Sequence, residues 1–241
     1  MLLLWGLYDK ADNKQQKLLI YTLILLQKLH KNQRILHQIA SYNKEEVKEL
    51  QTKLKSEVSE LLNEQYNNIV KLIENSLISS YQEAEKILNE ALGVNGSLTL
   101  QEIKNLISET WVGTKNFKQR LDWNLQQILK KYEELLKNDV EDWQLKKLQE
   151  NYFYRLRRLL DTETHRDINQ ACLNAYRNKG IEFVEWIAHM DERTCPICRN
   201  YDRKIYMLED APFCPDHPFC RCLLIPSTKE AYVKWISTNM D

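Results

Sequence analysis

Apolar positions in the first two thirds of the chain recur every three or four residues, as they do on one face of an α-helix. The longest such stretch is 44–92, in which valine, leucine and isoleucine keep this spacing from Val47 to Ile73. Other periodic stretches occupy 13–39, 100–110, 116–137, 140–160 and 163–179. No proline occurs before residue 196, so no helix is broken from within. The pattern predicts a long helical region.

Polar residues and glycines mark where these helices begin and end. Ser97 or Thr99 is expected to cap 100–110, with Gln101 or Glu102 completing a capping box. Asp161-Thr162 is a start signal and Gly180 a stop signal for the helix 163–179.

After Gly180 the pattern changes to short apolar runs at 182–189, 204–208 and 222–226. Runs of this length, rich in β-branched and aromatic residues, are typical of strands. We predict a small antiparallel sheet followed by a terminal helix near 228–237. The predicted domains are an N-terminal helical region (1–96), a helical middle region (97–160) and a C-terminal α+β module (161–241).

The C-terminal module contains all six cysteines, and five of them lie between residues 195 and 222. Cys195-Pro-Ile-Cys198 is a C-x₂-C pair, and His217-x₂-Cys220 offers a nitrogen and a sulfur at the same spacing. Zn²⁺ prefers four such ligands in a tetrahedron. We predict a structural zinc site made by Cys195, Cys198, His217 and Cys220, with Cys222 as the alternative to Cys220. Reduced metal-free thiols and disulfides remain the competing interpretations.

With four ligands available, the site has no open coordination position, which favours a structural over a catalytic ion. Cys172 and Cys214 are interpreted as packing residues, and Glu163 with His165 as an unfavoured catalytic pair. The predicted fold class is therefore mostly α: a long N-terminal helical region followed by a small α+β module with a zinc-stapled β-hairpin. We predict no enzyme activity.

The amino-acid composition limits the classes of partner that the sequence predicts. Lys plus Arg and Asp plus Glu both number 34, so the net charge is zero and gives no general attraction to nucleic acid. The candidate phosphate-binding residues lie in one stretch of the chain: Lys146, Lys147, Arg155, Arg157, Arg158 and Arg166. They predict at most weak, salt-sensitive and sequence-independent binding to double-stranded DNA. The apolar run 18–26 is too short to span a bilayer, and no membrane contact is expected.

Three separated motifs follow one another in the second half: DTETHRDINQA (161–171), VEWIAHMDERTCPICRNYDRKIYML (184–208) and APFCPDHPFCRCLLIP (211–226). In this order they resemble the phage head morphogenesis family, the minor head proteins similar to the F protein of phage Mu. WVGTKNFKQRL (111–121) resembles the segment that usually precedes these motifs in the family. The likeness covers about the last 130 residues of the chain.

The resemblance singles out Glu163, Arg166, Asn169, Asp191 and Arg193 as structural motif residues. Glu163 and Arg166 are spaced for an ion pair on one helix face, near the expected helix start. With Asn169 they would anchor the helix to the zinc loop. Asp191 would cap backbone amides of the C-x₂-C turn, and Arg193 would bond to a neighbouring carboxylate.

Two positions depart from the family pattern. The family often has Asp-Gly after the C-x₂-C pair, where this chain has Tyr201-Asp202-Arg203, so glycine's positive φ is not available there. Phe219 stands where the family usually has asparagine. Both changes concern local turn geometry.

The resemblance implies a minor capsid protein of a bacteriophage or prophage, made in the host cytoplasm and present in the virion at the portal vertex of the head interior. Its expected partners are the portal protein and other head proteins, and some relatives contact packaged DNA. The apolar stripe of 44–92 is the candidate docking face, although burial in the protein's own helix bundle is the commoner outcome for such a stripe. The alternatives are a DNA-binding zinc module without a capsid role and a zinc-dependent enzyme or toxin.

Overall fold

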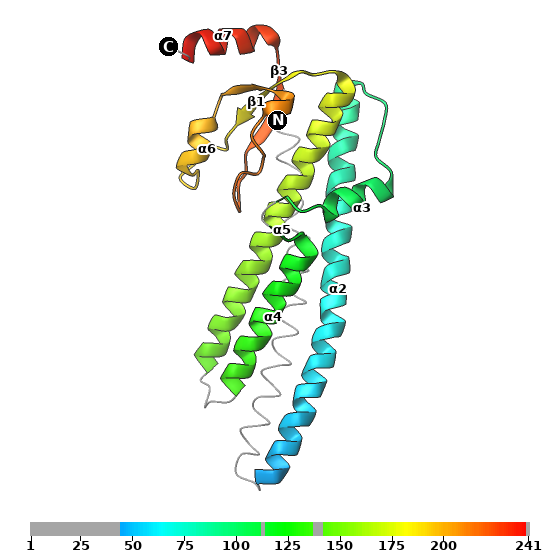
Figure 1. Cartoon of the computed structure of the whole chain (residues 1–241), viewed down its shortest axis with the longest axis vertical. Helices are drawn as coiled ribbons and strands as arrows, with labels where there is room; N and C mark the ends of the chain where they lie inside the picture. The colour runs from blue at the N-terminus through cyan, green and yellow to red at the C-terminus, as the bar shows by residue number, and fades with distance from the viewer. Residues whose placement is uncertain (1–43, 112–113, 137–141, 240–241) are drawn as a thin grey trace. The chain divides into compact units, whose positions relative to one another are not determined.

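The computed structural model describes residues 44–111, 114–136 and 142–239. The helix expected at 13–39 and the apolar run at 18–26 lie outside these residues. The described part is mostly helical with one small antiparallel sheet, as the sequence predicts (Figure 1). No helix within it has both the length and the hydropathy to cross a membrane.

Contacts divide the chain into two compact units, each made of segments far apart in sequence. Unit 1 comprises Met1–Asp12, Asn75–Glu109 and Arg158–Asp241, and unit 2 comprises Asn13–Glu74 and Thr110–Arg157. Two long helices, α2 (Lys44–Leu92) and α5 (Asp142–Lys179), contribute residues to both units. The three consecutive domains predicted from the sequence stay a prediction.

Unit 2 is built from helices. It contains the first part of α2, helix α4 (Phe117–Leu136) and the first part of α5. Its buried apolar residues are Ile69, Ile73, Phe117, Leu121, Leu125, Ile128, Leu148, Tyr152 and Leu156. Lys118 adds an ion pair to Glu74, with Nζ 3.1 Å from Oε1. Ile69 and Ile73 thus belong to the protein's own core, and the earlier members of the expected docking stripe lie outside the described side chains.

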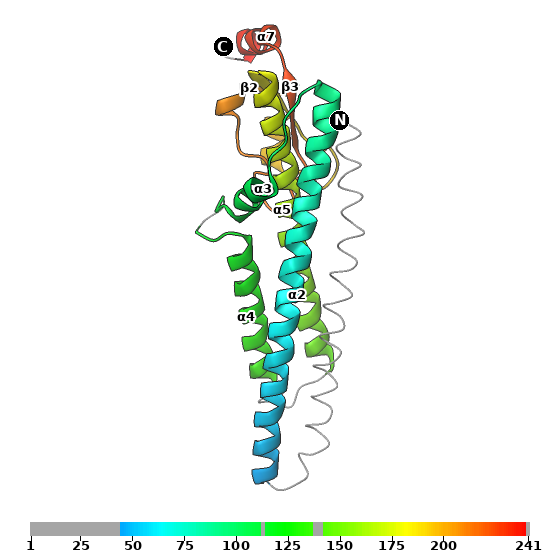
Figure 2. The same cartoon turned by 90° about the vertical axis from the view of Figure 1, so that its right-hand side faces the viewer.

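Unit 1 contains the end of α2, helix α3 (Leu100–Ser108) and the second part of α5. Thr99 caps α3, and Glu102 bonds back to the Thr99 backbone, so the predicted capping box is confirmed for this pair. Asn174 of α5 donates a 2.7 Å hydrogen bond to the buried Tyr81 hydroxyl of α2. These helices form the support on which the sheet of unit 1 is placed (Figure 2).

The sheet has three strands in the order β2-β1-β3: β1 (Phe183–Ile187), β2 (Ile205–Met207) and β3 (Leu223–Ser227). Both neighbours pair antiparallel with β1, and Val184 and Trp186 of β1 are buried. Short elements connect and follow the strands: α6 (Pro196–Tyr201), the 3₁₀ turn η1 (Leu208–Asp210) and α7 (Lys229–Asn239). The cysteine-rich segments are therefore the two connections, β1 to β2 and β2 to β3, and not the two sides of one hairpin.

Helix α5 corrects the expected boundary near residue 161. The chain does not restart there: one helix runs from Asp142 to Lys179. Thr162 does not cap a new helix, because its hydroxyl donates back to the Arg158 carbonyl at 2.6 Å within the same helix. Glu163 is therefore in a helix interior, where the dipole argument for it does not apply. The stop signal is confirmed, with Gly180 at φ 73° and its N–H bonded to the Arg177 carbonyl.

The backbone has an unusual conformation at both positions where the chain departs from the family pattern. Arg203 has φ 65° and Phe219 has φ 61°. Both values lie in the left-handed region, which is unfavourable for residues that carry a Cβ. These are the only non-glycine residues in the described part of the chain with positive φ. The turns keep the left-handed geometry that glycine or asparagine adopts readily, although neither residue is present.

Candidate metal centre

The C-x₂-C pair is held at the start of α6. Cys195 is the N-cap residue, and its sulfur accepts the backbone N–H of Cys198 at 3.3 Å. Pro196 occupies the first helical position, where its missing N–H costs nothing and its fixed φ favours the turn. The short helix therefore brings both sulfurs to one side of the turn.

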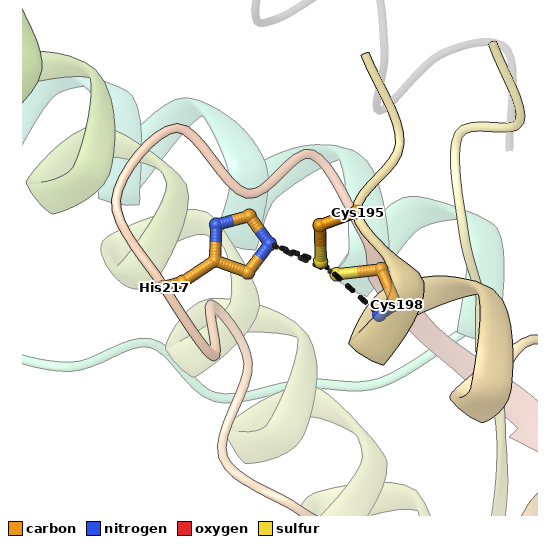
Figure 3. A group of neighbouring side chains, drawn as sticks. All are labelled: Cys195, Cys198 and His217. Atoms are coloured by element: carbon orange, nitrogen blue, oxygen red, sulfur yellow. Dashed lines mark hydrogen bonds between the residues drawn. The ribbon is translucent and has the colours of Figure 1, made fainter. Parts of the chain in front are cut away.

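His217 faces these two sulfurs from the connection between β2 and β3 (Figure 3). Its Nε2 lies 3.1 Å from the sulfur of Cys195 and 3.1 Å from the sulfur of Cys198. Its other ring nitrogen, Nδ1, is 2.8 Å from the Pro218 carbonyl, which can only accept. Nδ1 therefore carries a proton, and Nε2 is the ring nitrogen that faces the two sulfurs, as in a metal-binding histidine.

Cys220 and Cys222 form a second group with Cys198. Donor atoms lie within 4.8 Å of one another in each of two triads, Cys195–Cys198–His217 and Cys198–Cys220–Cys222, which share Cys198. The sulfurs of Cys198 and Cys220 are 3.8 Å apart. In a tetrahedral zinc site two sulfurs are about 3.8 Å apart and a sulfur and a nitrogen about 3.5 Å. Each triad offers the sulfur and nitrogen donors that a thiophilic ion such as zinc prefers, but no single group within 4.8 Å contains all four predicted ligands, Cys195, Cys198, His217 and Cys220.

The two candidates for the fourth ligand differ in their electrostatic surroundings. Hydrogen bonds from the thiols of Cys214 and Cys222 hold the pKa of Cys220 well below its usual range. The pKa of Cys222 is raised, first by its hydrogen bond to Cys220 and then by burial. Cys214 is buried, and its sulfur also lies 3.1 Å from the Cys222 carbonyl oxygen. All six cysteines of the chain are free thiols.

One face of α5 holds the segment that carries Cys220 and Cys222. The Thr162 hydroxyl accepts the Phe219 N–H at 3.3 Å, and Asn169 accepts the Leu224 N–H at 3.4 Å. The ring nitrogen Nε2 of His165 is 3.0 Å from the Cys222 carbonyl. Residues 162, 165 and 169 follow one another at helical spacing, so they form one stripe along α5.

His165 is completely enclosed in this contact. Burial lowers the pKa of its imidazole to about 4, so the ring is neutral at pH 7. Because the Cys222 carbonyl can only accept, Nε2 carries the proton and donates it. His165 is therefore a structural donor that fixes the backbone of the candidate ligand segment.

Asp191 links the two connections that carry the candidate ligands. Its carboxylate Oδ1 is 2.6 Å from Nη2 of Arg221, which lies between Cys220 and Cys222. The same carboxylate accepts the backbone N–H of Arg193 at 2.9 Å, and the Arg193 guanidinium is 3.5 Å from Oδ2. The bond to Arg221 holds the pKa of Asp191 well below its usual value. The contact of Arg193 with a carboxylate is the expected one, whereas the amide that Asp191 accepts belongs to Arg193 and precedes the C-x₂-C turn.

Glu163 and Arg166 point elsewhere on α5. Nη2 of Arg166 donates to the Leu106 carbonyl of α3 at 2.8 Å, and its Nη1 is 3.9 Å from Glu163 Oε2. The expected anchor thus divides into two: Asn169 contacts the ligand segment, whereas Arg166 fastens α3 to α5. Arg166 is 2% exposed, which removes it from the candidate phosphate-binding residues.

Sequence reasoning missed Thr162, His165 and Arg221 as positioning residues. His165 was weighed only as a catalytic partner of Glu163. Its spacing of four residues from Asn169 was the available signal, since two polar residues on one helix face often share a partner. The contact between Arg221 and Asp191 joins residues 30 apart in sequence and left no local signal.

The family comparison adds a finding of its own. Residues 124–225 match the family model described as phage Mu protein F like protein. This segment of the chain is thus similar to that family. The match spans α5 and the whole sheet up to Ile225 and includes every candidate ligand, so the predicted resemblance is confirmed there. WVGTKNFKQRL (111–121) lies outside the match. Neither a curated protein nor a solved structure matches the chain.

Proposed function

We propose that this protein is a minor capsid protein acting in the assembly of a bacteriophage head. The observation that supports this proposal is the phage Mu protein F like domain, because that family suggests head morphogenesis. The family is structural rather than catalytic. The protein would therefore act by shape and contact, as a component of the virion inside the head at the portal vertex.

The domain would owe its shape partly to a structural Zn²⁺ ion. Cys195, Cys198, His217 and Cys220 would hold it, with Cys222 as the alternative to Cys220. Support comes from the shared position of Cys198 between the two donor triads and from the orientation of His217. Bound zinc would supply no reaction here: it would join the two connections of the sheet and stabilise the fold.

The portal protein and other head proteins are the proposed partners, together with sequence-independent contact to double-stranded DNA. The exposed side chains of α4 and α5 and the surface of the metal-bearing connections are available for such contacts.

A catalytic alternative has little support from the contacts. Glu163 and His165 are 1% and 3% exposed, and His165 is bonded to the Cys222 backbone. A substrate could not reach either side chain without opening the unit.

Elemental analysis and co-purification test the proposal together. The full chain purified without chelator should contain one zinc per molecule, and Cys198→Ser should lose it because Cys198 belongs to both triads. Cys172→Ala is the matched control, since Cys172 is a buried thiol of α5 outside the triads and should leave the zinc in place. The tagged chain should also retain the portal protein from a head-assembly lysate. A metal-free chain would contradict the zinc site, and absence of portal protein would contradict the assembly role.

A further inference from the structure

Unit 2 carries an exposed tryptophan with two cations near its ring. Trp123 of α4 is 45% exposed. Lys115 Nζ lies 5.4 Å from the centre of its ring, and the guanidinium carbon of Arg155 on α5 lies 5.8 Å from it. A large aromatic side chain in water and two cations at its face are an arrangement that packing alone does not require.

Among the described residues, no carboxylate forms an ion pair with Lys115 or Arg155, and both cations lie near the ring of Trp123. The neighbouring carboxylate of Asp122 lies near Tyr66 instead. The ring of Trp123 therefore sits in a local excess of positive charge.

The surrounding helix surface extends this charge. Lys130 follows Trp123 by seven residues, which returns it to the same face of α4, and it is exposed. Lys146 and Lys147 are exposed on the first turns of α5. We call Lys115, Trp123, Lys130, Lys146, Lys147 and Arg155 the α4–α5 surface.

The neutral net charge of the chain hides a separation between the units. The described residues of unit 2 (44–74, 110–111, 114–136 and 142–157) contain 14 Lys and Arg against 12 Asp and Glu, a balance of +2. The described residues of unit 1 (75–109 and 158–239) contain 13 against 17, a balance of −4. The zero net charge therefore does not argue against a polyanion on unit 2.

We propose that the α4–α5 surface binds single-stranded nucleic acid, with one base stacked on Trp123 and phosphates contacted by Lys115, Arg155 and Lys130. Stacking on an exposed indole requires an unpaired base, because the bases of a duplex are already stacked on each other. Cations beside the ring supply phosphate contacts without reading the sequence. An acidic protein surface would use the cations but would have no need of the indole.

This inference rests on the nucleic-acid contact in the proposed function, names the surface that makes it, and replaces double-stranded DNA by a single strand as the preferred ligand of that surface. Its test uses the purified full chain with a labelled oligothymidylate of about 15 nucleotides, near the upper site size of small single-strand binding modules. A duplex of equal length and a polyglutamate of equal charge are the competitors.

The oligothymidylate should bind more tightly than the duplex, and polyglutamate should compete poorly. Trp123→Ala should weaken binding about tenfold, and Trp123→Phe should restore most of it because a π-face remains. Lys115→Gln and Arg155→Gln should each reduce the slope of log K against log salt concentration by about 0.7. Lys86→Gln removes the same charge from an exposed position of unit 1 and should change neither quantity.

Three outcomes would overturn the inference: unchanged binding by Trp123→Ala in a chain whose circular dichroism is unaltered, a preference for the duplex, or an equal loss with Lys86→Gln. Equal competition by polyglutamate would also overturn it, in favour of an acidic protein partner. Retention of portal protein without single-strand binding would remove this inference alone, and the reverse result would remove only the assembly role.

Discussion

The two units of the protein hold their shapes by different means. Unit 2 relies on apolar helix packing, with Ile73, Phe117 and Leu121 no more than 1% exposed. The ligand-bearing part of unit 1 has three strands of five, three and five residues and two irregular connections. These connections are held by directional contacts to α5, by the pair Asp191–Arg221 and by the cysteine–histidine cluster.

The difference shows what each kind of structure needs. Helices satisfy their own backbone groups, so burying an apolar face suffices to fix them. Short connections satisfy few of their own backbone groups and bury little apolar surface, so they need outside partners. His165 and Asn169 provide some of these partners, and a metal ion would provide the rest.

We expect the largest effect from replacing Cys198, the candidate ligand that both donor triads share. Cys198→Ser should remove the metal and destabilise unit 1 by roughly 5 kcal/mol or more, because binding energy at a structural zinc site is folding energy. Helix signal from unit 2 should persist in circular dichroism at temperatures where the tryptophan environment of the sheet has melted. Cys172→Ala should retain the metal, and an unchanged melting curve for Cys198→Ser would contradict the comparison.

A substitution in the apolar core tests unit 2. Leu121 is 1% exposed, so Leu121→Ala should cost about 3 kcal/mol through lost apolar contact and a residual cavity. Chemical denaturation followed by circular dichroism measures this loss, and elemental analysis should show an unchanged metal content. Loss of metal from this variant would mean that the two units do not depend on different forces.

A smaller effect concerns the buried carboxyl of Asp167 in α5. Burial raises the pKa of Asp167 well above 3.8, Arg166 opposes this shift, and neither carboxyl oxygen has a hydrogen-bond partner among the described residues. Below pH 3.8 the group is protonated in both the folded and the unfolded chain. As the pH rises above 3.8 the unfolded chain loses the proton while the folded chain keeps it, so stability falls.

Asp167→Asn should therefore stabilise the protein by about 1 kcal/mol or more at neutral pH, the value of one pKa unit. The gain should vanish as the pH falls below 3.8. Thermal melts of both chains across this range measure it, with the exposed Asp210→Asn as control. A gain that is independent of pH would contradict the titration of Asp167 as its cause.

The smallest expected effect is at the turn after α6. Arg203→Gly should stabilise unit 1 by up to about 1 kcal/mol, because glycine adopts φ 65° without a Cβ penalty. The loss of the exposed 3.2 Å pair with Glu185 should reduce this gain only slightly. Arg203→Ala loses the same pair but keeps the penalty, so its melting temperature should not rise. Equal melting temperatures for the two variants would remove backbone strain as the reason.

The helices and the candidate ligands were predictable because their signals are local. The bounds of α2 agree with the predicted stretch 44–92, since apolar periodicity and Gly93 determine where a helix forms and ends. The cysteine spacing likewise indicates which side chains could share an ion. The boundary at Asp161-Thr162 was wrong, because a capping residue is also compatible with a helix interior when the residues on both sides are buried.

The sequence by itself determined the helical and strand segments, the donor atoms near residues 195–222 and the likeness to phage head proteins. Only the tertiary structure decided which partners meet: His165 with the Cys222 carbonyl, Arg221 with Asp191, and Arg155 with Trp123. The net charges of the two units also differ, +2 against −4 over the described residues. The reason is physical: periodicity and spacing are properties of neighbouring residues, whereas contacts across 30 to 60 residues depend on how the whole chain packs.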